Sequence, residues 1–219
     1  MELCTEPEAN VILTMAQRHL NAIESTSAGR LFDAVSAILG IQKRSTFEGE
    51  ASMALEFAAE AWQKEHEVKN TENTKNAKNA ENVKNAQNAK NGKHTDVKEH
   101  EHIFMQTNAI VWRMIEGRRQ GEDVGKLAYE FHQLLAMEIC AACENVRTQK
   151  NCNQVALSGG VFQNRLLLEL VEKKLLNRKF QVLRHHLIPP NDGGIGLGQA
   201  VYGMAYLNKK KQTDSNNVK

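Results

Sequence analysis

Apolar side chains repeat every three or four residues through most of the chain, which is the spacing of one face of an α-helix. The clearest case lies between residues 24 and 40, and its apolar positions are Leu31, Phe32, Val35, Ile38 and Leu39. Ser25, Thr26 or Ser27 can cap this helix, and Gly40 can end it. Further helices are expected over residues 8–23, 49–62, 103–117, 121–148 and 195–207.

Histidines and cysteines on these helices are expected to be packing residues. His19 lies on the apolar face of the first helix, and His132 adjoins the apolar face of the 121–148 helix. Cys140 and Cys143 form a C-x-x-C pair, but no second pair with zinc-site spacing accompanies them. Small core residues are therefore the favoured interpretation.

A different pattern begins at residues 155–157, a short apolar run that predicts a buried strand. The Ser158–Gly160 turn interrupts it, a helical pattern resumes at Gln163, and residues 180–183 predict a second strand. The fold class is therefore α/β. A strand, a Gly-Gly turn and a helix can bring backbone N–H groups close to a phosphate or nucleoside. The same pattern is also typical of a tight connection that binds nothing.

Asparagine recurs at every third position from Asn70 to Asn91, mostly among Lys, Ala, Thr and Glu. A period of three gives no fixed face on a helix of 3.6 residues per turn, and almost no apolar side chain is available for burial. This Lys-Asn tract lacks arginine and interleaved aromatics, so RNA binding is disfavoured. Its metal-ligating side chains would bind a metal only weakly, because a flexible tract fixes no geometry. They are His94, Asp96, His100 and His102.

These patterns divide the chain into four parts. Residues 1–63 form a helical first part, 64–102 a disordered Asn/Lys-rich insert, 103–208 the remainder with the Gly-Gly turn, and 209–219 a polar tail.

Composition excludes some functional classes. The chain has 219 residues, 41% of them hydrophobic, which suffices for one large or two small domains. A net charge of +2 gives no electrostatic footprint for nucleic acid. No apolar run approaches a membrane span, and the acidic N-terminus is unlike a signal peptide. Four cysteines are sparse, which fits a reducing cytoplasm.

Acidic side chains at turns and helix shoulders are candidate binding residues. Asp33 follows Phe32 at the edge of an apolar stripe, where it is either a solvated acid or a ligand-binding one. Glu48 precedes Gly49 at a turn. Its carboxylate can accept a hydrogen bond from a ligand hydroxyl, or it can stabilise the following helix by interacting with the positive end of the helix dipole. Asp192 follows a strand at a helix N-terminus, where it can act as an N-cap or bind a metal ion.

Three sequence segments together resemble the C-terminal end of the HypF carbamoyltransferase family of [NiFe]-hydrogenase maturation. They are Ser25-Thr-Ser-Ala-Gly-Arg-Leu-Phe-Asp-Ala-Val, Phe47-Glu-Gly-Glu-Ala-Ser-Met-Ala-Leu-Glu, and Leu157-Ser-Gly-Gly-Val-Phe-Gln-Asn-Arg-Leu-Leu with Pro189-Pro-Asn-Asp-Gly-Gly-Ile-Gly-Leu-Gly-Gln. More distantly they look like the threonylcarbamoyl-transferases that modify tRNA. The resemblance implies the second lobe of an actin/Hsp70-like (RNase H-like) ATPase fold, a mixed sheet flanked by helices.

The resemblance also implies site residues. Asp33 is expected to meet the nucleotide sugar, the Gly-Gly turn to approach the nucleoside and phosphates, and Asp192 to complete a site for one divalent metal, Fe, Zn or Mg. The full set expected at the nucleotide is Gly29, Arg30, Asp33, Glu48, Gly49, Ser158, Gly159, Gly160 and Asn164. The remaining metal ligands are expected outside this chain.

Members of the family use carbamoyl phosphate and ATP, through a carbamoyl-adenylate, to carbamoylate the C-terminal cysteine of a HypE-type partner. The acylphosphatase-like, zinc-binding and adenylate-forming modules of full-length members are not seen here, nor is the first actin-like lobe with its His-x-x-x-His pair. The chain is therefore expected to be a fragment, a split-gene product or a degraded copy, with little transfer activity alone. The alternatives are a tRNA threonylcarbamoyl-transferase lobe and a non-catalytic interaction module for the missing N-terminal half or a maturation protein.

Overall fold

The computed structural model describes residues 4–23, 25–73 and 105–216, and side chains within them up to 67 and from 105 to 209. Its helices are α1 (Glu6–Gln17), α2 (Ala28–Leu39), α3 (Glu50–Asn73), α4 (Thr107–Arg119), α5 (Val124–Lys150), α6 (Arg165–Asn177) and α7 (Ile195–Asn216). Two strands, β1 (Gln154–Leu157) and β2 (Gln181–Arg184), and two short 3-10 helices, η1 (Gly160–Gln163) and η2 (Asp192–Gly194), complete it.

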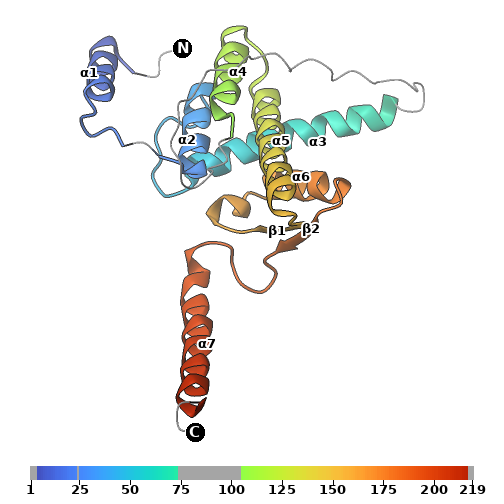
Figure 1. The fold of residues 1–219 in the computed structure, drawn as a ribbon. Helices are drawn as coiled ribbons and strands as arrows, with labels where there is room; N and C mark the ends of the chain where they lie inside the picture. The colour runs from blue at the N-terminus through green and yellow to red at the C-terminus, as the bar shows by residue number, and fades with distance from the viewer. Residues whose placement is uncertain (1–3, 24, 74–104, 217–219) are drawn as a thin grey trace.

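Helices α2 to α5 form a packed layer around α5 (Figure 1), which contacts α2, α3, α4 and α6. Ser27 begins α2 as expected, because its hydroxyl accepts from the Arg30 N–H, and Gly40 ends it with a φ of 77°. Phe32 meets Phe131 of α5 edge-on at 5.0 Å between ring centroids. Helices α2 and α3 therefore share one hydrophobic core with α4, α5 and α6, which come later in the chain.

The strands form a parallel pair joined by α6, with Gln154 beside Gln181 and Leu157 beside Arg184. α6 buries Leu167, Val171 and Leu175 against α5 and the strands. The α/β class is as predicted, and the sheet is small. The mixed sheet is not found in the described residues, because both strands belong to one β–α–β unit, whose crossover makes them parallel.

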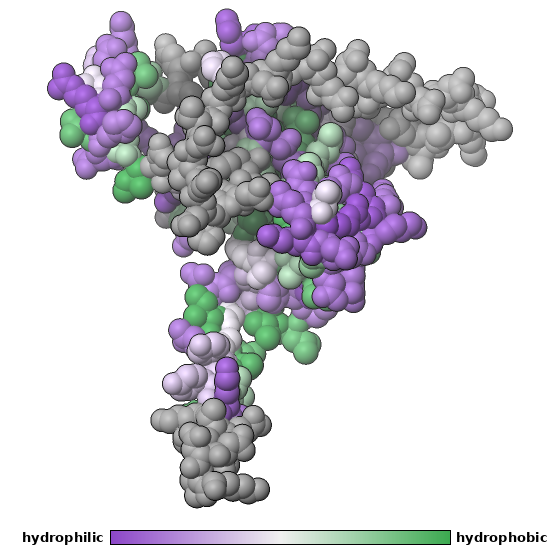
Figure 2. All heavy atoms as spheres, in the orientation of Figure 1, coloured by the Kyte–Doolittle hydropathy of each residue, from purple (hydrophilic) through white to green (hydrophobic). Residues whose placement is uncertain are grey.

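Helices α1 and α7 bury little against the other helices. α7 projects away from the core (Figure 1), and Figure 2 shows hydrophobic side chains along its surface. α1 has no buried residue, so the expectation that His19 lies in the core or at its boundary is wrong. His19 is exposed and has a φ of 51°, beyond the end of α1. None of the described helices is long and apolar enough to cross a membrane.

Several helix ends differ from the sequence-based expectations. The backbone of α3 continues to Asn73, so the start of the expected disordered insert is helical, and residues 74–102 lie outside the described part. α7 continues to Asn216 through the expected polar tail. Gly117 lies inside α4, where the close approach of Leu127 favours glycine over larger residues. Polar residues of good helix propensity extend a helix even without burial, which hydrophobic periodicity does not detect.

Candidate functional site

The Gly-Gly turn follows β1 at the edge of the sheet where both parallel strands end. Gly159 has a φ of 96°, a conformation that side chains with a Cβ rarely adopt. A Cβ built at Gly160 would meet no atom within 4 Å, as at Gly159, but Gly160 does not have a positive φ. Its backbone N–H also makes no hydrogen bond within the described residues. Gly159 is therefore required by the turn itself, whereas Gly160 leaves open space beside a free donor.

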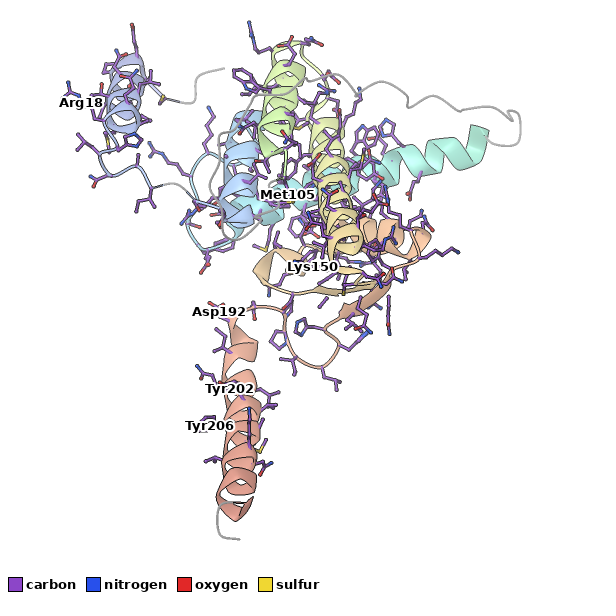
Figure 3. All side chains as sticks on the ribbon, in the orientation of Figure 1. Arg18, Met105, Lys150, Asp192, Tyr202 and Tyr206 are labelled. Carbon is purple, nitrogen blue, oxygen red and sulfur yellow. The ribbon has the colours of Figure 1, made fainter. Side chains whose placement is uncertain are left out.

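Two hydrogen bonds join this turn to the segment after β2. The Gly159 N–H donates to the Pro190 carbonyl at 2.8 Å, and Ser158 Oγ lies 2.8 Å from His185 Nε2. The chain then enters the turn that carries Asp192, at the N-terminal end of α7 (Figure 3). The structure thus brings together the two glycine turns that are far apart in the sequence.

Asn191, not Asp192, caps the second turn. Its side-chain oxygen accepts from the Gly193 N–H at 3.1 Å. The N-cap interpretation of Asp192 is therefore wrong, because the cap falls one residue earlier. Asp192 is exposed, and its carboxylate is not used in a hydrogen bond or ion pair of the described residues.

The N-terminus of α6 is already satisfied by protein groups. Glu56 of α3 accepts from the N–H groups of Arg165 and Leu166 at 2.6 and 3.2 Å. Asn164 accepts from the Leu167 N–H with its side chain at 2.8 Å and from the Leu168 N–H with its carbonyl at 3.0 Å. A carboxylate therefore occupies the place where a ligand phosphate would meet a free helix N-terminus.

The pKa of Glu56 is raised, mainly because the carboxyl group is buried. The hydrogen bonds from the two α6 N–H groups oppose this effect. Glu56 is only 8% exposed, although it lies in an alanine-rich helix that no sequence motif connects with the turn. Sequence reasoning missed this residue. A buried acid four residues before Glu60 on the same helix carries no local signal for its partner, which lies more than a hundred positions away.

His132 is buried, as predicted, and its ring makes a hydrogen bond with Asn164. Its Nδ1 lies 2.7 Å from the Ala128 carbonyl, which only accepts, so Nδ1 carries the proton and Nε2 accepts from Asn164 at 3.0 Å. Burial lowers the pKa of His132 to about 4, against smaller opposing contributions from Ala128 and Glu60. Asn164 is itself buried, so its side chain serves the α5–α6 junction.

The other expected nucleotide-binding residues lie on α2 and near the start of α3. Gly29 and Arg30 are exposed, and the Arg30 guanidinium lies 3.4 Å from the half-buried Asp33 carboxylate. α2 packs against η1, and Phe32 contacts the His132 ring at 5.4 Å between centroids. Asp33 is thus carried on a helix that lies against the Gly-Gly turn.

Glu48 and Gly49 lie at a turn before α3, with a φ of 83° at Gly49. Glu48 is exposed. The acid that organises this turn is Glu50, which accepts from the Thr46 backbone and hydroxyl and from Gln42. The Thr46 backbone N–H chiefly lowers the pKa of Glu50. No hydrogen bond or ion pair of the described residues joins Glu48 or Gly49 to the Gly159 turn.

The described residues do not form a metal centre by themselves. They hold no group of three or more His, Cys, Asp or Glu side chains suited to a metal ion. Asp192 supplies one exposed carboxylate, which is insufficient alone. His94, Asp96, His100 and His102 lie outside the described residues.

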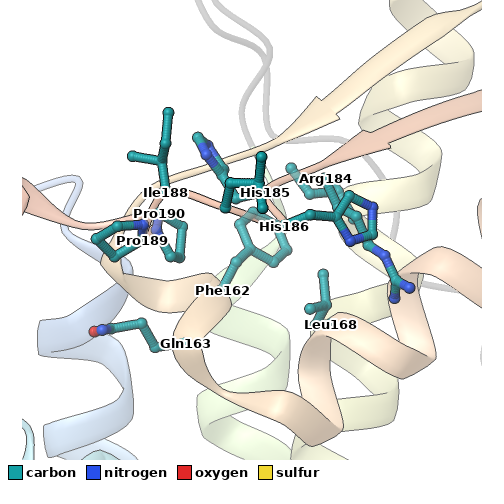
Figure 4. A pocket seen from close by; sticks show the side chains of 11 residues that line it. Phe162, Gln163, Leu168, Arg184, His185, His186, Ile188, Pro189 and Pro190 are labelled. Atoms are coloured by element: carbon teal, nitrogen blue, oxygen red, sulfur yellow. The ribbon is translucent and has the colours of Figure 1, made fainter. Parts of the chain in front are cut away.

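A hollow of about 300 Å³ lies beside the turn, under the segment between His185 and Pro190 (Figure 4). Phe162 of η1 and Leu168 of α6 form its apolar base, and both histidines of the segment line its rim. Arg184 also lines it, but its guanidinium pairs with Glu172 of α6 at 3.0 Å.

Helices packed around a small parallel sheet, with a glycine turn directly after β1, define an α/β subdomain. The family model described as the carbamoyltransferase Kae1-like domain, second subdomain, matches residues 2–199. The chain therefore belongs to the HypF carbamoyltransferase family, as its motifs predicted.

Relatives in two organisms and one solved structure support this assignment. The probable carbamoyltransferase HypF of Methanocaldococcus jannaschii is 25% identical over 209 residues, 94% of this chain and 23% of that protein. The carbamoyltransferase HypF of Rhodobacter capsulatus is 31% identical over 194 residues, 88% of this chain and 21% of that protein. A crystal structure of full-length HypF in the phosphate- and nucleotide-bound form is 28% identical with a TM-score of 0.70, covering 93% of this chain and 23% of that one. The chain thus spans less than a quarter of the length of these relatives.

Proposed function

We propose that this chain forms the second, nucleotide-contacting lobe of a HypF-type carbamoyltransferase, in an actin/Hsp70-like fold completed by regions that its relatives carry outside the match. The observation that carries the proposal is the hydrogen bond from Gly159 to the Pro190 carbonyl. It holds the Gly-Gly turn beside the turn that bears Asp192. Family membership supplies the reaction class.

In this proposal the nucleoside approaches from the open side of the turn. Gly160 offers space and a free N–H there, whereas the α6 N-terminus is closed by Glu56. Asp33, on the helix packed against η1, accepts hydrogen bonds from the sugar hydroxyls. Ser158, at the end of β1, and Arg30, in the first turn of α2, are proposed as further contacts of the nucleotide. Asp192 contributes one ligand to a divalent metal whose other ligands come from outside the described residues.

The proposed reaction transfers a carbamoyl group from a carbamoyl-adenylate, formed from carbamoyl phosphate and ATP. The C-terminal cysteine thiolate of a HypE-type partner attacks the carbamoyl carbon, a C–S bond forms, the C–O bond to the phosphate breaks, and AMP leaves. This lobe orients the adenylate so that the thiolate meets the carbonyl, which is a positioning contribution. The reaction is placed in the cytoplasm, consistent with four unpaired cysteines.

The test is carbamoyl transfer to a HypE-type acceptor, measured with the chain alone and with the remaining regions of the Rhodobacter capsulatus relative added. We expect transfer only from the mixture. The site variant is Gly160→Ala, which places a methyl group where no atom of the described residues lies within 4 Å and should keep the fold while reducing transfer. Robust turnover by the isolated chain, or equal turnover with Gly160→Ala in the mixture, would refute the proposal.

A further inference from the structure

Ser158 and His185 lie side by side because the register of the parallel strands continues past their ends. Leu157 is beside Arg184 in the ladder, so Ser158 and His185 are the next residues on each strand. Their side-chain atoms Oγ and Nε2 are 2.8 Å apart, an ordinary hydrogen-bond distance. The sequence did not indicate this pair, because strand register decides it.

The segment that starts at His185 is held to the turn at both of its ends. The second attachment is the Gly159 N–H, which donates to the Pro190 carbonyl at 2.8 Å. Between these points the chain arches over the hollow beside Phe162 (Figure 4), and Leu187 is 97% exposed. Little burial stabilises the arch, so these two hydrogen bonds decide its position.

We propose that His185 is a positioning residue for the nucleotide site. By holding Ser158, it keeps the 185–190 segment against the glycine turn, so that the Pro190 carbonyl reaches Gly159 and the following turn, which carries Asp192, stays joined to the glycine turn. The ligand side of this inference rests on the proposed function, whereas the arrangement of the segment does not.

His186 provides a matched control. It is the next residue, is exposed as His185 is, and lines the rim of the same hollow, but within the described residues it makes no hydrogen bond. A general loss of ring volume at this rim would affect both variants. A loss of the Ser158 hydrogen bond would affect only His185→Ala.

The experiment compares the full chain with its His185→Ala, His185→Gln and His186→Ala variants. Exchange of the Gly159 amide is followed by NMR, and the affinity for AMP by calorimetry. We expect His185→Ala to accelerate Gly159 exchange and weaken AMP binding, each about tenfold, the effect of losing one hydrogen bond of ordinary strength. His185→Gln, whose amide can still bond Ser158, should restore most of both, and His186→Ala should match the wild type.

Unchanged Gly159 exchange in His185→Ala, or an equal acceleration in His186→Ala, would overturn the proposal. Core amides such as that of Leu135 report whether each variant keeps its fold. If the wild-type chain binds no AMP, the proposed function is weakened, but Gly159 exchange still tests the positioning role.

Discussion

The hydroxyl of Ser36, on the core-facing side of α2, has no hydrogen-bond partner among the described residues. It is fully buried, and its Oγ makes no hydrogen bond within the described residues. An unsatisfied buried hydroxyl costs about 1–3 kcal/mol of desolvation. Ser36→Ala should therefore raise the free energy of unfolding by about 1 kcal/mol, measured by urea denaturation. A loss of stability would mean that the hydroxyl has a partner.

His132 should make stability depend on pH. Its pKa is lowered to about 4 by burial, below the ordinary value for an unfolded histidine of about 6.5. As pH falls through 6.5, the unfolded state binds a proton that the native state does not, so stability present above 6.5 is lost. Between pH 6.5 and pH 5 this loss should be about 2 kcal/mol.

Urea denaturation of the wild type and of His132→Gln across this range measures the effect. The variant cannot titrate there, so it should be less stable at pH 7 but nearly free of this slope. Buried Glu56, whose pKa is raised, has the opposite sign, because its stabilisation grows as pH falls. An equal slope in both proteins would show that His132 is not the responsible group.

Sequence reasoning predicted the glycine turn after β1, but not the side chains that support it. Gly159 was predictable because a strand followed by Gly-Gly is a local signal. Glu56 and His185 were not, since each acts on a residue brought close by tertiary packing or strand register. Asn164 was expected at the nucleotide from its place in a motif, but its burial against His132 depends on how α5 meets α6.

Close packing of α3 against α5 disfavours any side chain larger than that of glycine at Gly125. A Cβ at Gly125 of α5 would lie 2.9 Å from Trp62 Cβ and 3.1 Å from the Ala58 carbonyl of α3. Neither atom is the end of a flexible side chain, so the helices would have to separate. The helix patterns over α2 and α5 were predicted from periodicity, whereas this close crossing was not, because periodicity gives faces and not distances.

We expect Gly125→Ala to lower the free energy of unfolding by about 1–3 kcal/mol, the range for overpacking, despite the better helix propensity of alanine. Gly203→Ala on α7 is the control, because a Cβ there meets nothing within 4 Å. It should leave the unfolding of the core unchanged. Thermal denaturation distinguishes the two, and equal stability of Gly125→Ala and wild type would argue against the close α3–α5 approach.

The exposed apolar surface of α7 predicts that another protein surface covers this helix. Ile195, Leu197, Val201, Tyr202, Met204, Tyr206 and Leu207 are all more than half exposed. At 3.6 residues per turn these positions are spread around the helix axis, and a helix that is hydrophobic on all sides is typically buried. The relatives are more than four times as long as the matched region, so the cover is expected from their remaining regions.

Hydrogen exchange tests this expectation. Amides of α7 should exchange rapidly in the isolated chain and become protected when the remaining regions of a relative are added. Val201→Asp should leave the stability of the isolated chain unchanged, because Val201 is 53% exposed, but abolish the added protection. Protection that is the same in wild type and Val201→Asp would show that α7 is not the contact.

A titration of the wild-type chain with AMP, followed by the amide resonances of Gly159, Gly160 and Asp192, examines the joined turns most directly. We expect all three signals to move together with a single dissociation constant, and those of α6 near Glu56 to stay in place. No movement at millimolar AMP, or movement at only one of the two turns, would contradict the account.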